Sequence, residues 1–281
     1  MDRYRPGRII YTDKNCIKTY DGTTTRLIAG RSDSHVYRDY REGVGAEARF
    51  NAIQGFMQIS DVRMVVADSF NSCLRLIDRE SGTTSAFSGQ CEKEGYQDRL
   101  PGLFHYPWYV VMDRNDQSQL LVADLKNSAV RTVDVASGAV GSFVNSSMLQ
   151  FISHLTQDEM GNMYVSAHHA LYKITYDNKV ISLLSGSAED SLSSGIGYRD
   201  STLLNSLYSS PQDIIFIGPD MLLVADDGNK KLRLVDINSN NVTTLNVASP
   251  DDYPERPVAI LLTENSLFVG VHQTILQYQC E

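Results

Sequence analysis

Apolar and polar residues alternate along many short stretches of this chain, which is the pattern of β-strands that bury one face. Clear examples are LRLID, which begins at Leu74, and LRLVD, which begins at Leu232. No segment carries a long apolar stripe with a 3.6-residue period, so we expect very little helix. The pattern therefore predicts an all-β chain.

One pattern of strands recurs along nearly the whole sequence. An apolar strand that ends in Asp is followed by a polar turn, a second strand that ends in Asp, another turn and a third strand. The six copies, two of them degenerate, close their first strand at Asp13, Asp68, Asp124, Ala167, Asp226 and Val271. The spacing between copies, about 43 to 59 residues, suits four short strands with their connections rather than a helix pair.

A further apolar run precedes most copies, for example after Pro107, Pro211 and Pro257. We expect each run to be the innermost strand of a four-stranded sheet and to be buried on both faces. Radial repetition of such sheets leaves only short, protected edges, which predicts a β-propeller. The innermost strand of the first copy is missing or lies outside this sequence, and the last copy lacks its outermost strand. Both end blades are therefore expected to be incomplete, and the closure of the ring is left open between a strand supplied from elsewhere and a sequence that is part of a longer protein.

The residues of the repeat carry a resemblance to a known family. The Ala-Asp pairs that end at Asp68, Asp124 and Asp226 are each followed by Asn and then by an apolar residue and Arg, and the loops include Gly95-Tyr-Gln-Asp98 and Gly197-Tyr-Arg-Asp200. This pattern resembles the NHL repeat. The resemblance implies one propeller domain over residues 1–281 with six blades, five to seven being left open. The blades are expected at about 8–29, 50–88, 104–144, 151–185, 207–247 and 256–280.

The recurring carboxylates have a role that needs no ligand. Asp13, Asp68, Asp124 and Asp226 each precede a polar turn, where an Asp side chain can accept hydrogen bonds from the backbone N–H groups of the turn. Gly82 and Gly138 supply permissive backbone angles between the second and third strands of their copies. We therefore interpret these Asp residues as structural and not as catalytic acids.

The four cysteines, Cys16, Cys73, Cys91 and Cys280, bear on the compartment. Cys73 begins one strand of its copy and Cys91 follows the end of the next, so antiparallel pairing makes a Cys73–Cys91 disulfide reasonable. Cys16 occupies the repeat position of Cys73, and with Cys280 it would join the first and last copies. The alternative is four buried, reduced thiols.

Two sequons add to this picture of the compartment. Asn145-Ser-Ser and Asn241-Val-Thr lie in predicted outer turns, where N-glycosylation acceptors are expected. Together with the disulfide candidates they favour a secreted protein, or an extracellular or lumenal part of a larger one, whose signal peptide is absent from this sequence.

Charge narrows the choice of partner. The chain has 25 Lys and Arg against 34 Asp and Glu, a net charge of −9 and a pI near 5.1. This balance opposes a polyanionic partner, so nucleic acid is not expected, and RNA binding as in intracellular NHL proteins is a remote alternative. No apolar run approaches the roughly 18 residues of a membrane span.

Sequence motifs for chemistry are missing. There is no HExxH, no G-x-S-x-G and no Walker A sequence, and Gly43-Val-Gly-Ala-Glu-Ala48 lacks the strand and helix context of a dinucleotide site. His168 and His169 are interpreted as turn residues that point to opposite faces. Trp108, at a strand start, is expected to pack. We therefore predict no catalytic residue, cofactor or metal.

Propeller enzymes, such as metal-dependent lactonases and an amidating lyase similar to the NHL family, gather ligands from several innermost strands and so leave no local motif. A metal-dependent hydrolase or lyase with an axial site is thus the alternative function. Its candidate residues lie near innermost strands and are His105, His154, Asp213 and Glu264.

The function favoured by the sequence is non-catalytic recognition outside the cell, of a protein or a glycan. The partner is expected on the long loops of one propeller face, which are Ser32–Arg49, Glu92–His105 and Ser187–Asn205.

Overall fold

The computed structural model describes residues 2, 4, 5, 7–31, 39–187, 196–245, 256–263, 266–271 and 274–279. Within them the regular structure consists of 23 strands and six 3-10 helices of three residues each, so the prediction of an all-β chain is confirmed. No helix in this described part is long and apolar enough to cross a membrane.

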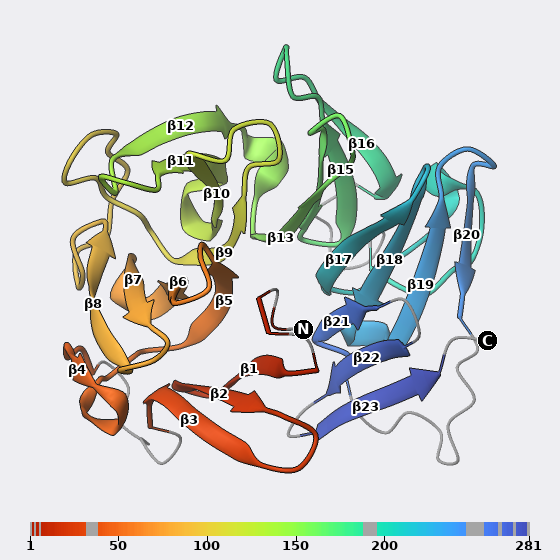
Figure 1. Cartoon of the computed structure of the whole chain (residues 1–281). Helices are drawn as coiled ribbons and strands as arrows, with labels where there is room; N and C mark the ends of the chain where they lie inside the picture. Colours follow the sequence, from red (N-terminus) through yellow and green to blue (C-terminus); the bar gives the residue numbers. More distant parts are fainter. Residues whose placement is uncertain are drawn as a thin grey trace. The chain divides into compact units, whose positions relative to one another are not determined.

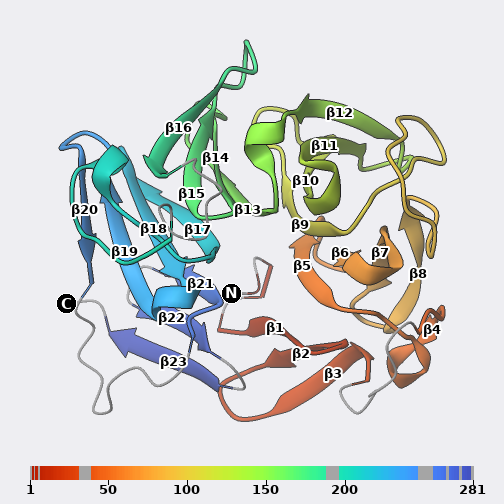
Figure 2. The ribbon, with the colours of Figure 1, turned by 180° about the vertical axis from the view of Figure 1, so that it is seen from behind.

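The strands form six antiparallel sheets in chain order, which are the blades of a six-bladed β-propeller (Figure 1). The chain divides into two compact units, Met1–Ser146 and Ser147–Glu281, and each contains three blades. In both views the sheets of each unit follow one another in sequence order, and within each sheet consecutive strands of the chain lie side by side, except that β4 lies beside β8 (Figure 2).

Unit 1 holds blades 1 to 3. Blade 1 has three strands, blade 2 has five because the short β4 pairs with β8, and blade 3 has four. The strands are β1 (Ile9–Asp13), β2 (Cys16–Tyr20) and β3 (Thr25–Gly30); β4 (Gly43–Val44), β5 (Ile53–Gln58), β6 (Arg63–Asp68), β7 (Cys73–Asp78) and β8 (Thr83–Ser88); and β9 (Pro107–Met112), β10 (Gln119–Asp124), β11 (Ala129–Asp134) and β12 (Val140–Asn145). The 3-10 helices are η1 (Gly45–Glu47), η2 (Ser69–Asn71) and η3 (Leu125–Asn127).

Unit 2 holds blades 4 to 6, of which the first two have four strands and the last has three. The strands are β13 (Ile152–Gln157), β14 (Met163–Ala167), β15 (Ala170–Ile174) and β16 (Ile181–Gly186); β17 (Pro211–Gly218), β18 (Met221–Asp226), β19 (Lys231–Asp236) and β20 (Asn241–Thr244); and β21 (Ala259–Leu262), β22 (Ser266–Val271) and β23 (Thr274–Gln279). The 3-10 helices are η4 (Ser147–Leu149), η5 (Leu203–Asn205) and η6 (Asp227–Asn229).

The end blades are incomplete, as predicted. β1 ends in an Asp, as the second strands β6, β10 and β18 do, so β1 is the second strand of its blade. The described residues of blade 1 show no counterpart of the innermost strand β5. Blade 6 in turn shows no described counterpart of the outermost strands β8, β12, β16 and β20.

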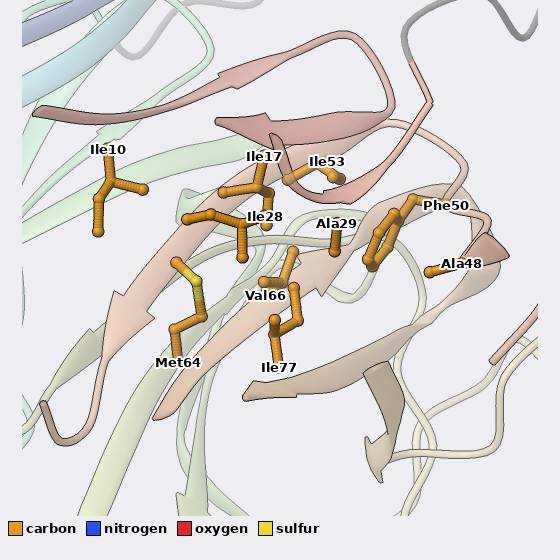
Figure 3. Packing of buried hydrophobic residues seen from close by; sticks show 10 residues of the cluster. All are labelled: Ile10, Ile17, Ile28, Ala29, Ala48, Phe50, Ile53, Met64, Val66 and Ile77. Atoms are coloured by element: carbon orange, nitrogen blue, oxygen red, sulfur yellow. The ribbon is translucent and has the colours of Figure 1, made fainter. Parts of the chain in front are cut away.

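Apolar side chains fill the space between neighbouring sheets of each unit. Between blades 1 and 2, Ile17 and Ile28 pack against Phe50, Met64 and Val66 (Figure 3). Equivalent clusters lie between blades 2 and 3, 4 and 5, and 5 and 6. Burial of this kind contributes about 25 cal/mol for each Å² of apolar surface removed from water and stabilises each blade against the next.

The expected burial of the innermost strands is wrong in one respect. β5 and β9 carry several partly exposed residues, whereas the second strands β6 and β10 are buried almost throughout. A second strand has a hydrogen-bonded neighbour at each edge and packed residues on both faces. An innermost strand pairs along one edge alone, which leaves β5 and β9 more open, whereas β13 is buried at all but one position, as expected.

Candidate functional site

A buried ionic cluster stands at the turn after the second strand of each regular blade. In blade 3, Asp124 Oδ1 accepts a hydrogen bond from the backbone N–H of His105 at 2.8 Å. Its Oδ2 accepts from Asn127 Nδ2 at 2.7 Å and from Arg131 Nη1 at 2.9 Å. The side chains of Asp124 and Arg131 are fully buried, so neither group can meet a substrate.

The same cluster recurs in blades 2 and 5 with nearly the same distances. Asp68 and Asp226 replace Asp124, and each accepts one backbone, one Asn and one Arg hydrogen bond between 2.7 and 2.9 Å. The donors are Asn51, Asn71 and Arg75 in blade 2, and Ser209, Asn229 and Arg233 in blade 5.

Two aromatic rings of the preceding loop cover each Arg of these clusters. The Arg131 guanidinium lies 4.2 Å from the ring centroid of Tyr96 and 5.6 Å from that of Phe104. It also donates to the Leu103 carbonyl at 3.1 Å and to Asp98 at 2.5 Å. Cation–π contacts and charged hydrogen bonds together fix the loop to its blade.

The same arrangement covers the other two arginines: Tyr40 and Phe50 over Arg75, and Tyr198 and Tyr208 over Arg233. The described parts of the loops that the sequence suggested for recognition therefore contact the blades through Tyr40, Tyr96 and Tyr198.

The carboxylates of the three clusters make only contacts within the fold, but the backbone N–H groups that donate hydrogen bonds to them differ from the expected ones. The N–H that each receives comes from the segment before the innermost strand and not from its own turn. Burial raises the pKa of Asp68 and of Asp124 to about 6, while the Arg, Asn and backbone donors act to lower it. Burial also raises the pKa of Asp226.

Asp13 differs from these three carboxylates. It is partly exposed and pairs with Lys18 Nζ at 2.5 Å, because blade 1 has Lys18 at the position of Arg75.

Once the repeat is accounted for, an aromatic cluster remains that the repeat does not require. Phe70 lies in the turn between Asp68 and Asn71, at a position occupied by Lys126 in blade 3 and Gly228 in blade 5. Phe70 is 41% exposed. An exposed phenyl ring at a position that tolerates Lys or Gly is not a contribution to the core.

Two rings of blade 3 pack against Phe70. Its ring centroid lies 5.1 Å from that of Tyr106 and 6.5 Å from that of Trp108, and both rings are tilted relative to it. Tyr106 and Trp108 are partly exposed. Tilted aromatic pairs at these separations are a favourable arrangement and hold the exposed ring in place.

At the position of Tyr106 the backbone conformation is the same in every blade from 2 to 5, but the side chain differs from blade to blade. The residue before each innermost strand of blades 2 to 5 has a positive φ, between 49° and 61°. These residues are Ala52, Tyr106, Phe151 and Ser210. Such a φ is uncommon for a bulky residue and places Tyr106 where Ala or Ser would serve the backbone equally well. Gln54, Ser153 and Gln212 occupy the position of Trp108.

His105 and Glu94 extend the cluster at one edge. The His105 ring meets Tyr106 edge-on with centroids 5.0 Å apart, and its Nε2 lies 3.3 Å from Glu94 Oε2. We call Phe70, His105, Tyr106 and Trp108 the aromatic patch; all four belong to unit 1.

A disulfide supports the patch. Cys73, directly after the turn of Phe70, is bonded to Cys91, which confirms the predicted pairing. The next residue, Glu92, donates its backbone N–H to the Asn71 carbonyl at 2.7 Å. Both links fix the 92–105 loop beside the turn, so the patch is presented by a rigid support.

The axial candidates of the sequence come together only in part. In unit 2, His154 Nε2 lies 2.8 Å from Asp213 Oδ1, and Asp213 Oδ2 accepts from the Ile260 N–H at 2.6 Å. His154 and Asp213 are buried and occupy the same register position in neighbouring innermost strands, opposite Ser166 and Ala225. This chain of contacts joins β13, β17 and β21.

The other two candidates do not join that pair. His105 belongs to the aromatic patch, and Glu264 lies outside the described residues. Within the part of the chain that the structure describes, no group of three or more His, Cys, Asp or Glu could hold a metal ion.

His168 and His169 do lie in the turn between β14 and β15, but the expectation that they point to opposite faces is wrong. Their ring centroids are 4.1 Å apart, because His168 has a φ of 54° and the chain is not extended there. His168 stacks on Phe151 at 5.5 Å, and His169 Nδ1 accepts from the Ser210 N–H at 3.0 Å. The adjacent rings are thus held by neighbours in unit 2.

The remaining predicted sites stay predictions. Cys16 is buried and its thiol donates to the Asp13 carbonyl at 3.1 Å, whereas Cys280 lies outside the described residues. Asn145 is the last residue of β12 and Asn241 the first of β20, so both lie at the ends of outermost strands and not in the expected turns; both are exposed, as a glycan acceptor must be.

Phe70 and Tyr106 were not expected to form a site from the sequence, and Trp108 was expected only to pack. The available signal was the repeat itself. An alignment of the copies places Phe70 against Lys126 and Gly228, which identifies it as a residue that the turn does not need.

No family model matches this chain, and no curated protein matches it. Solved structures do resemble it. A chain of a nidogen–laminin complex gives a TM-score of 0.66 at 9% identity, with 97% of this chain and 89% of that chain covered. An auxiliary nutrient binding protein from Bacteroides ovatus gives 0.69 at 11%, with 97% and 67% covered.

An enzyme is also among the similar structures. A catalytically inactive virginiamycin B lyase from Staphylococcus aureus, solved with quinupristin, gives a TM-score of 0.62 at 10% identity, with 97% of this chain and 90% of that chain covered. At such identities the likenesses show the shared propeller fold, which supports many unrelated functions.

Proposed function

We propose that this protein is a non-catalytic recognition module, an NHL-type propeller outside the cell, that binds a protein partner through the aromatic patch. The observation that carries the proposal is the exposed Phe70 ring, packed on Tyr106 and Trp108 at positions that the repeat leaves free. Residues that the fold does not require and that expose aromatic surface are best explained by binding.

The chemistry of the patch favours a protein over other partners. Aromatic residues dominate the energetic centres of protein interfaces, where they fill pockets on the partner. The disulfide and the Glu92–Asn71 hydrogen bond hold the patch in one conformation, so little conformational entropy is lost on binding. A glycan is the alternative partner.

Several features support a site outside the cell. A Cys73–Cys91 disulfide persists in an oxidising compartment. The exposed sequons Asn145 and Asn241 fit glycosylation there, and the net charge of −9 opposes nucleic acid.

The test compares capture of surface and secreted proteins by the wild type, Phe70→Ser and Val180→Ser. Val180 is a matched control because it is 52% exposed and lies in unit 2, away from the patch in sequence. We expect that the wild type and Val180→Ser capture the same partner protein and that Phe70→Ser does not capture it. Equal capture by all three, or binding of glycans alone on an array, would refute the proposal.

The second candidate function is a metal-dependent hydrolase or lyase, and the His154–Asp213 contact is the observation that favours it. Two buried residues of the types that bind metals lie on adjacent innermost strands, but they supply only two of the three protein ligands of a typical catalytic zinc site. Metal analysis of the purified protein tests it: bound metal that is lost on Asp213→Asn, and retained on Asp220→Asn, would favour the enzyme.

A further inference from the structure

β23 is the third strand of its blade, and each comparable third strand in blades 2 to 5 is covered by a fourth. β7, β11, β15 and β19 pair antiparallel with β8, β12, β16 and β20. β23 pairs with β22 on one side, and the described residues show no strand on its other side. The outer edge of β23 therefore carries backbone groups without a sheet partner in the described part of the chain.

The register shows which backbone groups of β23 face this edge. In blade 5 the Leu232 carbonyl of β19 accepts a hydrogen bond from the Leu245 N–H, on the side of β20. Backbone groups of alternate residues point the same way along a strand, so Leu234 faces that side as well. By register against the second strand, Ile275 and Gln277 of β23 take the places of Leu232 and Leu234.

Nothing in the sequence of β23 protects the edge. Proteins usually block a free edge with Lys, Pro, a bulge or a short strand. β23 is six residues long and reads TILQYQ, without a charge, a proline or a glycine. Ile275 is 39% exposed at this edge.

We propose that the outer edge of β23 binds an extended segment of a partner polypeptide, which adds to blade 6 as its antiparallel fourth strand. Main-chain hydrogen bonds from Ile275 and Gln277 would supply affinity, as in other cases of strand addition.

The other blades indicate the side chain that the added strand needs. Each fourth strand of blades 2, 3 and 5 places a small β-branched residue opposite the same apolar position of the third strand. These pairs are Thr84 with Ile77, Val140 with Val133, and Val242 with Val235. All three fourth-strand residues are buried. Tyr278 holds the corresponding position of β23, so the partner should place Val or Thr opposite it.

Outside the described residues, the sequence of unit 2 has two stretches whose composition does not favour a β-strand. Residues 246–255 contain Pro250 and Pro254, which lack the N–H that a paired strand donates. Residues 188–195 read AEDSLSSG and are rich in Ser, Asp and Gly, which strands disfavour. A segment from a second polypeptide is therefore the better occupant.

A labelled peptide with the sequence of residues 138–145, GAVGSFVN, is a suitable probe because it copies the fourth strand of blade 3. We expect saturable binding by fluorescence anisotropy, together with slower hydrogen exchange at the amides of residues 274–279. The same peptide N-methylated at alternate amides, or with Asp in place of its Val140 residue, should bind at least tenfold more weakly. Equal binding of the N-methylated peptide, or protection elsewhere in the chain, would overturn the proposal.

The matched variants are Gln277→Pro and Gln277→Ala. A proline whose missing N–H faces an open edge leaves the blade intact but cannot donate to an added strand. Gln277→Pro should weaken peptide binding at least tenfold, and Gln277→Ala should bind like the wild type. Equal binding by both variants would refute the strand addition. Phe70→Ser should not affect this peptide, which keeps the outcome separate from that of the aromatic patch.

Discussion

The Arg131 guanidinium donates a hydrogen bond to the Asp124 carboxylate at 2.9 Å, with both side chains fully buried. A buried ion pair alone contributes little to the free energy of unfolding, because removing each ion from water costs several kcal/mol and the attraction between the two charges only offsets this cost. Here the same guanidinium also binds Leu103 and Asp98 of the preceding loop, so one ion pair joins strand, turn and loop.

Arg131→Ala should therefore destabilise the protein strongly. The variant leaves Asp124 buried without its cation and frees the loop, and breaking a buried pair in this way costs about 3–5 kcal/mol. The free energy of unfolding from urea denaturation measures the loss. Arg63→Ala, at an exposed position of β6, is the control and should change stability by less than about 0.5 kcal/mol. A loss below about 1 kcal/mol for Arg131→Ala would show that the cluster does not hold the loop.

Proton uptake on folding tests the buried carboxylates. Burial raises the pKa of Asp68 and Asp124 to about 6 from 3.8, so at pH 5 both are protonated in the folded chain and ionised in the unfolded chain. Folding then binds protons, and the stability contributed by these groups falls as the pH rises from 3.8 to 6. Calorimetry in two buffers of different ionisation enthalpy measures the uptake.

Asp124→Asn should reduce the uptake at pH 5 by about one proton. Asp134→Asn is the control, since hydrogen bonds from Ser137 lower the pKa of Asp134 and leave it ionised in both states at that pH. Identical uptake by the wild type and Asp124→Asn would contradict the assignment.

The Cys73–Cys91 disulfide should contribute to stability and to the order of the patch. It closes a loop of 18 residues in sequence separation, for which the loss of unfolded-state entropy is worth about 3 kcal/mol. Cys91→Ser should lower the free energy of unfolding by about that amount and speed hydrogen exchange at Glu92, which is hydrogen-bonded to Asn71. Free Cys73 and Cys91 in an Ellman assay of the denatured, non-reduced wild type would contradict the pairing.

The strands and turns could be read from the sequence because their signals are local. Alternation and the closing Asp of each strand recur in every regular copy, and Gly82 and Gly138, in the turns of blades 2 and 3, both have the expected positive φ of 74°. The Cys73–Cys91 pair follows from the same local logic, since neighbouring strand ends meet in an antiparallel sheet.

The residues that contact the buried Asp–Arg clusters could not be predicted from local sequence patterns. The N–H that Asp124 accepts comes from His105, 19 residues earlier, and the rings over Arg131 come from two places in one loop. Such contacts depend on how the loop returns to its blade, which no local pattern encodes. The aromatic patch likewise joins Phe70 to Tyr106 and Trp108, residues of two different blades.

The most direct test of recognition by the aromatic patch is the dissociation constant of the captured partner, once purified, for the wild type, Phe70→Ser and Val180→Ser. Trp108 is the single tryptophan of the chain, so its fluorescence reports binding at the patch. Loss of a central aromatic anchor costs about 2 kcal/mol or more, so we predict affinity at least tenfold weaker for Phe70→Ser and unchanged for Val180→Ser. Equal affinity for all three proteins, with no change in Trp108 emission, would contradict the account.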